Sequence, residues 1–324
     1  MPLDPHARRL LRMLSVTTEP SASAASVDAR REAFRGLMQF AGKPPEICAV
    51  EDFSLPGPES AIGVRLYTPI ATSAGPFPGL VFFHGGGLVA GSLDTHDSLC
   101  RSLTAAIGCR TIAVDYRLAP EHKFPAAVTD ARTAWAWVMT HAAELNLDPE
   151  RIGVAGDSAG GALAIAACDA ARQSGAAMPA FQLLLCPITD FAAETPSRGA
   201  FASGYLIDKT MIAQDLAHCL PSGVTPDDPR ISPLRLAGLS GLPPAFIHTA
   251  EFDPFRDEGE AYAEKLRGDG VKAAVTCHQG MVHLFYAMPS VIPAARDAIR
   301  QIGTEIRVAL DQNDFGWHHL KYES

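Results

Sequence analysis

From residue 47 onward, short runs rich in β-branched and aliphatic residues alternate with longer segments whose apolar residues recur at helical spacing. The alternation begins at 47–55, and further strands are predicted at 63–69, 79–87, 110–117, 151–158, 180–187, 244–253 and 272–280. Helices are predicted between them at 97–108, 126–145, 159–175 and 255–270, and after the last strand at 291–310. Strands joined by helices pair in parallel, and both faces of such a sheet are covered. The sequence therefore predicts an α/β fold with a mostly parallel sheet flanked by helices.

Two stretches fall outside this alternation. Residues 1–45 hold two segments with helical apolar spacing, and residues 191–232 hold loops and one helical segment without a convincing strand. We expect residues 46–190 and 233–310 to form the α/β core, and residues 311–324 to form a polar C-terminal tail. Open α/β sheets bind ligands beyond the carboxyl ends of their strands. Residues 1–45 and 191–232 are therefore expected to form a cap over that edge.

Composition excludes several classes of protein. Hydrophobic residues make up 47% of the 324 and charged residues 19%, which is typical of a globular domain. The net charge of −9, with dispersed basic residues, does not suit a nucleic-acid backbone. No apolar run reaches the roughly 18 residues of a spanning helix, and the N-terminal segment is charged where a secretory signal is apolar. We expect a cytoplasmic protein that binds neither nucleic acid nor membrane, with its seven cysteines reduced.

The segment VAGDSAGGALAIA places Ser158 between glycines, at the point where a predicted strand becomes a helix. It matches G-x-S-x-G, the nucleophile elbow of hydrolases. Glycine at positions 156 and 160 removes side chains that would clash in so sharp a turn, and it lets the Ser158 hydroxyl stand exposed on strained backbone. The alternative is a serine that only caps the following helix.

A second motif, HGGG, covers His84, Gly85, Gly86 and Gly87 directly after an apolar strand. It matches the oxyanion-hole loop of esterases. We expect the backbone N–H groups of Gly85 and Gly86, together with that of Ala159, to converge on the oxyanion of a tetrahedral intermediate. One such donor lowers the barrier by roughly 3 to 4 kcal/mol. A phosphate-binding loop is the alternative, but the motif has neither a following Lys-Ser/Thr nor G-x-G-x-x-G spacing.

Serine is a weak nucleophile at neutral pH, so a carboxylate and a histidine base are expected downstream, in the order Ser, acid, His. His283 is the best candidate for the base because it lies in a loop after the strand predicted at 272–280. The other histidines are expected in structural or solvated roles: His278 within or at the edge of that strand, His248 inside a strand, His84 in the oxyanion loop, and His318 and His319 in the tail.

The acid is expected at the carboxyl end of the preceding strand. Asp253 follows that strand directly and precedes Pro254, which favours an extended backbone. Glu251 is the serious competitor. Asp257 and Glu258 fall within the next helix, where surface or capping roles are expected.

Six segments, in order between about residues 50 and 300, resemble the hormone-sensitive-lipase-like family of carboxylesterases, bacterial lipolytic family IV. They are HGGGLVAGS, DYRLAPEHKFPAA, GDSAGG, SPL, LPPAFIHTAEFDPFRDEGEAYAEKL and GMVHLF. The resemblance implies the α/β-hydrolase fold, with a mostly parallel eight-stranded sheet flanked by helices and a helical cap. It also implies that Ser158 is the nucleophile, Asp253 the orienting acid and His283 the base, the residues selected above from the pattern.

The chain departs from the family pattern at three positions. Leu88 follows HGGG where an aromatic residue is usual, Ala162 replaces a common asparagine, and Leu284 replaces a glycine. None of them removes a catalytic group. We expect Leu88 and Leu284 at the pocket wall and Tyr205 and Met211 to line the pocket from the cap. Members of the family often dimerise through the last strand and the neighbouring helix, so the resemblance implies a homodimer.

Together these features predict a serine carboxylesterase that acts on small-molecule short-chain acyl or aryl esters through an acyl-enzyme, without a metal or organic cofactor. Two alternatives stay open. One is a receptor-like protein that binds a ligand without turnover, which the presence of all three triad residues disfavours. The other is an amidase, lactonase or deacetylase that uses the same triad.

Overall fold

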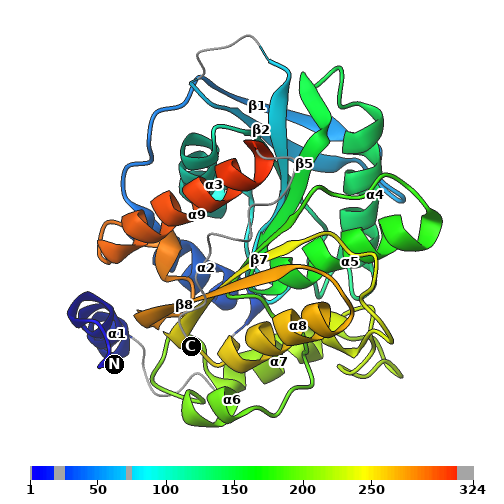
Figure 1. Ribbon diagram of the computed structural model, residues 1–324. Coiled ribbons are helices and arrows are strands. Elements are labelled where there is room, and N and C mark those ends of the chain that lie inside the picture. Colours follow the sequence, from blue (N-terminus) through cyan, green and yellow to red (C-terminus); the bar gives the residue numbers. More distant parts are fainter. Residues whose placement is uncertain (1, 18–25, 71–74, 312–324) are drawn as a thin grey trace.

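The computed structural model describes residues 2–17, 26–70 and 75–311. One eight-stranded sheet crosses the molecule in the order β1-β2-β4-β3-β5-β6-β7-β8 (Figure 1). The strands are β1 (Ala49–Leu55), β2 (Ile62–Thr68), β3 (Phe77–Phe83), β4 (Arg110–Asp115), β5 (Leu147–Asp157), β6 (Gln182–Leu185), β7 (Ala245–Phe252) and β8 (Ala273–Val282). β2 runs antiparallel to both of its neighbours, β1 and β4, and the other neighbouring strands pair in parallel. The predicted mostly parallel, eight-stranded sheet is confirmed.

Burial along the strands explains their sequences. Every residue of β6 is buried, and β3 is buried at all positions but one, so both read as nearly continuous apolar runs. The edge strand β1 mixes exposed and buried positions. β3 and β6 are therefore held in the interior of the sheet, and β8, at the other edge, is half-buried over most of its length.

Helices cover both faces of the sheet. α3 (Leu93–Ile107) and α9 (Ala294–Asp311) pack together on one face, and α4 (Ala126–Thr140), α5 (Ala159–Ser174) and α8 (Arg256–Gly268) cover the other (Figure 1). Each face has its own hydrophobic core. Leu103 and Ile302 belong to the first, and Val138 and Leu163 belong to the second.

The two segments expected to form a cap are helical. The first holds α1 (Pro5–Thr17) and α2 (Val27–Met38), and the second holds α6 (Pro196–Ala200) and α7 (Lys209–Cys219), one helix more than expected. Short 3₁₀ turns cover Gln39–Ala41, Pro233–Arg235 and Phe285–Ala287. α1 is attached to β8, where the Asp4 N–H donates to the Gly280 carbonyl at 2.9 Å.

Several helix boundaries differ from those predicted. α3 begins at Leu93, four residues early, because Ser92 and Thr95 form a reciprocal capping box. α4 ends at Thr140, and the chain turns through Asn146, whose φ is +50°. The tail from residue 312 onward, with His318 and His319, lies outside the described residues.

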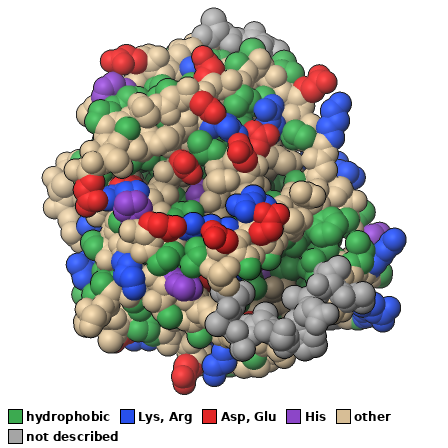
Figure 2. Space-filling view, turned by 180° about the vertical axis from the view of Figure 1, so that it is seen from behind, with side chains coloured by type: hydrophobic (Ala, Val, Ile, Leu, Met, Phe, Trp, Pro, Cys, Tyr) green, Lys and Arg blue, Asp and Glu red, His purple; other side chains and the backbone are tan. Residues whose placement is uncertain are grey.

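The surface carries acidic and basic side chains interspersed on the face shown in Figure 2. No helix in the described part of the chain has the length and hydropathy needed to cross a membrane.

Candidate active site

Ser158 stands at the turn between β5 and α5 on a strained backbone. Its φ and ψ are 53° and −122°, outside the regions that non-glycine residues normally occupy. Hydrogen bonds hold it there: the Ser158 N–H donates to the Leu185 carbonyl at 2.9 Å, and the Ile188 N–H donates to the Ser158 carbonyl at 2.9 Å. The hydroxyl makes no capping bond to α5, so helix capping does not explain this serine.

The glycines beside Ser158 are required by backbone approach. A Cβ on Gly156 would lie 2.1 Å from the Gly160 carbonyl oxygen, and one on Gly160 would lie 2.0 Å from the Phe83 carbonyl oxygen. Both distances are far inside van der Waals contact. The motif therefore reflects a helix that starts directly against the ends of β3 and β5.

His283 and Asp253 meet at the carboxyl edge of the sheet. His283 Nδ1 lies 2.7 Å from Asp253 Oδ2, and both side chains are buried. Asp253 Oδ1 accepts the Phe255 N–H at 2.8 Å, which fixes the carboxylate. Because a carboxylate only accepts, Nδ1 is the donor in this hydrogen bond, and Nε2 is the ring nitrogen left for proton exchange with another group. The rings of Phe255 and His283 pack in an edge-to-face arrangement, with their centroids 5.2 Å apart.

The other candidate acids form hydrogen bonds or ion pairs with groups other than His283. The Glu251 carboxylate accepts the Gly280 N–H at 2.7 Å. Asp257 accepts the Ser197 N–H at 2.8 Å. The expectation of a surface or capping role is wrong for Glu258, which is fully buried. Its Oε2 forms an ion pair with Arg198 Nε at 2.8 Å.

The other histidines of the core are also engaged elsewhere. His278, in β8, lies 3.1 Å from His248, whose other ring nitrogen is 3.2 Å from Glu305. Burial and the neighbouring His248 lower the pKa of His278 to about 3. His84 stacks on Tyr116 at 4.3 Å, and burial lowers its pKa to about 3 as well. Both are neutral structural groups at physiological pH.

The oxyanion loop departs from the expected donor set. The Gly85 N–H donates to Asp157 Oδ1 at 2.9 Å, and both residues are buried, so this amide is not available to an oxyanion. Gly86 and Gly87 instead line the same pocket as Ser158. The expectation for Gly85 is therefore corrected: it anchors the loop to Asp157, and Gly87 takes its place as the candidate donor with Gly86 and Ala159.

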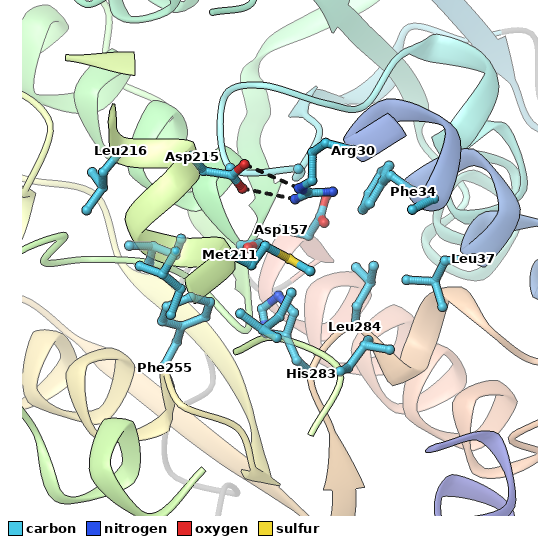
Figure 3. A pocket seen from close by; sticks show the side chains of 18 of the residues that line it. Arg30, Phe34, Leu37, Asp157, Met211, Asp215, Leu216, Phe255, His283 and Leu284 are labelled. Carbon is cyan, nitrogen blue, oxygen red and sulfur yellow. Dashed lines mark hydrogen bonds and ion pairs between the residues drawn. The ribbon is translucent and has the colours of Figure 1, made fainter. Parts of the chain in front are cut away.

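Ser158 and His283 open into one cavity of about 200 Å³, roofed by α2 and α7 (Figure 3). Met211 and Leu284 line it. Leu88 and Tyr205 do not, among the residues described, which corrects both expectations. Leu88 is buried in the hydrophobic core, and the Tyr205 ring stacks on that of Phe252 with centroids 5.7 Å apart. The remaining apolar lining, not anticipated from the sequence, comprises Leu14, Ala33, Phe34, Leu37, Ile188, Phe191, Leu206, Ile207, Ile212, Leu216 and Phe255.

An ion pair also lines this pocket. Arg30 of α2 and Asp215 of α7 make two hydrogen bonds, and Figure 3 shows them bridging the two helices. Burial raises the pKa of Asp215, and the Arg30 charge opposes that shift. Nothing in the sequence pattern links these two residues, which are 185 positions apart.

One set of three potential metal ligands lies close together in the described part of the chain. The side-chain atoms of Cys186, Asp253 and His283 are within 4.8 Å of one another. The hydrogen bond between Asp253 and His283 already uses the carboxylate and imidazole atoms that face each other. A metal ion and the dyad are therefore alternatives at this position.

Comparisons with known proteins identify relatives over most of the chain. A family model described as alpha/beta hydrolase fold matches residues 80–287. The carboxylic ester hydrolase LipN of Mycobacterium tuberculosis is 44% identical over 263 residues, 79% of this chain and 69% of the relative. The ethyl acetate hydrolase of Pseudomonas putida is 38% identical over 280 residues, 84% of this chain and 86% of the relative.

Solved structures agree with the same assignment. The ester-hydrolase EH1AB1 from the metagenome of Lake Arreo, complexed with a bipyridine phosphonate derivative, has a TM-score of 0.92 and 36% identity; the match covers 96% of this chain and all of that one. An esterase of Pyrobaculum calidifontis has a TM-score of 0.87 and 38% identity, with coverage of 94% and 98%.

Proposed function

The chain belongs to the hormone-sensitive-lipase-like family of carboxylic ester hydrolases with the α/β-hydrolase fold, and from this premise we propose that it cleaves short-chain acyl and aryl esters with Ser158, His283 and Asp253. The observation that carries the residue assignment is the buried dyad of His283 and Asp253, at 2.7 Å, in a pocket that Ser158 shares. The strained backbone at Ser158 supports its role as the nucleophile.

In the proposed reaction, Ser158 Oγ attacks the ester carbonyl while His283 Nε2 takes its proton. The Asp253 carboxylate stabilises the imidazolium. The oxyanion accepts hydrogen bonds from the N–H groups of Gly86, Gly87 and Ala159, and the alcohol leaves with the proton from His283. Water then attacks the acyl-enzyme through the same steps and releases the acid.

Pocket size supports small substrates. A cavity of about 200 Å³ is below the roughly 300 to 1,000 Å³ of typical small-molecule sites. Its lining is mostly apolar, so it favours an uncharged acyl or aryl group. The name of the Pseudomonas putida relative, an ethyl acetate hydrolase, is in keeping with this size.

The test is hydrolysis of p-nitrophenyl esters from acetate to decanoate. We expect turnover that is highest for acetate or butyrate and falls with longer chains. We expect Ser158→Ala to lower kcat by at least about 10³-fold, since the nucleophile is removed. Unchanged turnover in that variant would remove Ser158 from the mechanism.

The two alternative functions can be distinguished from an esterase by the same kind of hydrolysis assay. A receptor-like protein would bind esters without releasing p-nitrophenol. An amidase, lactonase or deacetylase would show a higher kcat/KM on anilide, lactone or acetylated substrates than on the matched ester. The intact Ser158, His283 and Asp253 disfavour the receptor.

We further propose a homodimer in the cytoplasm. The dimer is supported by the position of β8, which is an edge strand of the sheet among the described strands. The cytoplasmic location is supported by the seven cysteines, none of which forms a disulfide. Light scattering with size-exclusion chromatography tests the dimer, and a mass of one chain would contradict it.

A further inference from the structure

An ion pair crosses the wall of the catalytic pocket. Arg30 Nε donates to Asp215 Oδ1 at 3.2 Å and Nη2 donates to Oδ2 at 3.0 Å. The two side chains are only 13% and 10% exposed, among mostly apolar neighbours (Figure 3). A buried ion pair adds little to stability, because desolvation offsets its attraction. Its place in the pocket wall points to a role in the reaction.

Asp215 rests directly on the oxyanion loop. A Cβ built on Gly87 would lie 2.0 Å from Asp215 Oδ2, so the carboxylate covers the α-carbon of this glycine. Cys219, one turn further along α7, donates its thiol to the Gly87 carbonyl at 3.3 Å. One face of α7 therefore contacts both the α-carbon and the carbonyl oxygen of Gly87.

The other cap helix contacts the same loop. Arg31 of α2 donates from Nε to the Val89 carbonyl at 2.9 Å and from Nη2 to the Ala119 carbonyl at 3.1 Å. Val89 lies two residues after Gly87. Both cap helices thus contact the oxyanion loop through separate bonds, and the Arg30–Asp215 pair joins the two helices above it.

We propose that Arg30 and Asp215 form a positioning pair that holds the oxyanion loop in its catalytic conformation. Gly86 and Gly87 have φ values of +121° and +66°, and glycine is free to leave such conformations unless neighbours prevent it. Oxyanion donors act through accurate placement, and small displacements weaken transition-state binding. The proposal rests on the proposed roles of Ser158 and of the Gly86 and Gly87 amides.

The experiment uses the full chain with p-nitrophenyl acetate, whose acyl group makes little use of the pocket wall. The variants are Arg30→Met, Asp215→Asn and the double variant. Arg35→Met is the matched control, because Arg35 lies on the same helix in an exposed pair with Glu32. Titration with a fluorophosphonate that labels the nucleophile gives the concentration of intact sites, to which kcat is normalised.

We expect each single variant to lower kcat about tenfold, a fraction of the 10²-fold or more that loss of a whole oxyanion donor costs. KM should change less than twofold. The double variant should be no slower than the single variants, because each single substitution already removes the Arg30–Asp215 ion pair. A trifluoromethyl ketone, which forms a tetrahedral adduct with its oxygen in the oxyanion hole, should bind more weakly by the same factor as kcat/KM falls. The control should match the wild type in all of these measurements.

Unchanged kcat in the folded single variants, with only KM or melting temperature altered, overturns the proposal in favour of a structural pair. If those variants do not fold, Arg30→Lys and Cys219→Ala decide. Each keeps part of the attachment and should lower kcat about two- to threefold, and wild-type values in both would also overturn the proposal. Failure of the proposed function is distinct, because the wild type itself would then not hydrolyse the ester.

Discussion

At the scale of single residues, the site depends on backbone segments that lie so close together that a side chain would not fit between them. Ser158 keeps its strained conformation because Leu185 of β6 accepts its N–H and Ile188, in the loop after β6, donates to its carbonyl. α5 begins against β3 because Gly160 has no Cβ. Strain of this kind persists only where the surrounding structure enforces it. The glycines are therefore part of the geometry of the proposed catalytic site.

Gly160→Ala should lower the free energy of unfolding by about 3 kcal/mol and abolish activity, because its Cβ would lie 2.0 Å from the Phe83 carbonyl oxygen. The matched control is Gly268→Ala at the end of α8, which has open space around it. The control should be neutral or more stable by up to about 1 kcal/mol. Urea unfolding measures both, and equal stability of the two variants would contradict the packing argument.

Asp253→Asn should reduce kcat by about 10⁴-fold with little change in KM. An amide at this position favours the wrong tautomer of His283 and cannot stabilise the imidazolium. Glu251→Gln provides the comparison, since Glu251 lies near the end of the same strand but accepts from the Gly280 N–H. A larger loss of kcat in Glu251→Gln than in Asp253→Asn would reverse the assignment of the acid.

Residue types and order were sufficient to select the buried dyad, because Asp253 and His283 each follow a strand of a parallel sheet. They were not sufficient to predict that the Gly85 N–H donates to Asp157. Which amide of a glycine loop faces the pocket depends on where the Asp157 carboxylate reaches, and Asp157 is 72 residues away. Spacing within the HGGG motif carries no information on that contact.

At the scale of elements, polar contacts link β8 through β7 to the helical layer. His278 in β8 contacts His248 in β7, which pairs with Glu305 of α9. The sequence predicted the strands and helices because their apolar periodicity is strong. It missed several ends, such as the start of α3, because a capping box at Ser92 adds a turn that apolar spacing does not mark.

The half-buried His278 should make the protein sensitive to acid. Its pKa is lowered from about 6.5 to about 3, so between these values the unfolded chain binds more protons than the native one, and the free energy of unfolding falls as pH falls. At pH 5 this amounts to about 2 kcal/mol. In His278→Gln the loss of stability between pH 7 and pH 5 should shrink by that amount. Denaturant unfolding at both pH values measures it, and an unchanged difference would show that His278 does not titrate in this way.

At the scale of the whole molecule, one pocket is assembled from both ends of the fold. Ser158 and His283 directly follow β5 and β8, while α2 and α7, which are more than 170 residues apart in sequence, supply its roof. Irregular segments such as 191–232 predict a cap by their lack of strands. They do not reveal pairs such as Arg30 and Asp215, because a contact between two distant helices leaves no periodic signal in either.

A cap built jointly from two segments should respond to enlargement from either side. Met211 of α7 and Leu37 of α2 both line the pocket, and truncating either makes room for a longer acyl chain (Figure 3). Each additional buried methylene contributes about 0.8 kcal/mol, or about fourfold in kcat/KM. Met211→Ala and Leu37→Ala should each raise kcat/KM for p-nitrophenyl hexanoate relative to acetate by about four- to tenfold. Met139→Ala on α4, outside the pocket, should leave that ratio unchanged. A shift in Met211→Ala alone would mean that the N-terminal helices do not bound the acyl site, and that the insertion forms the functional cap without them.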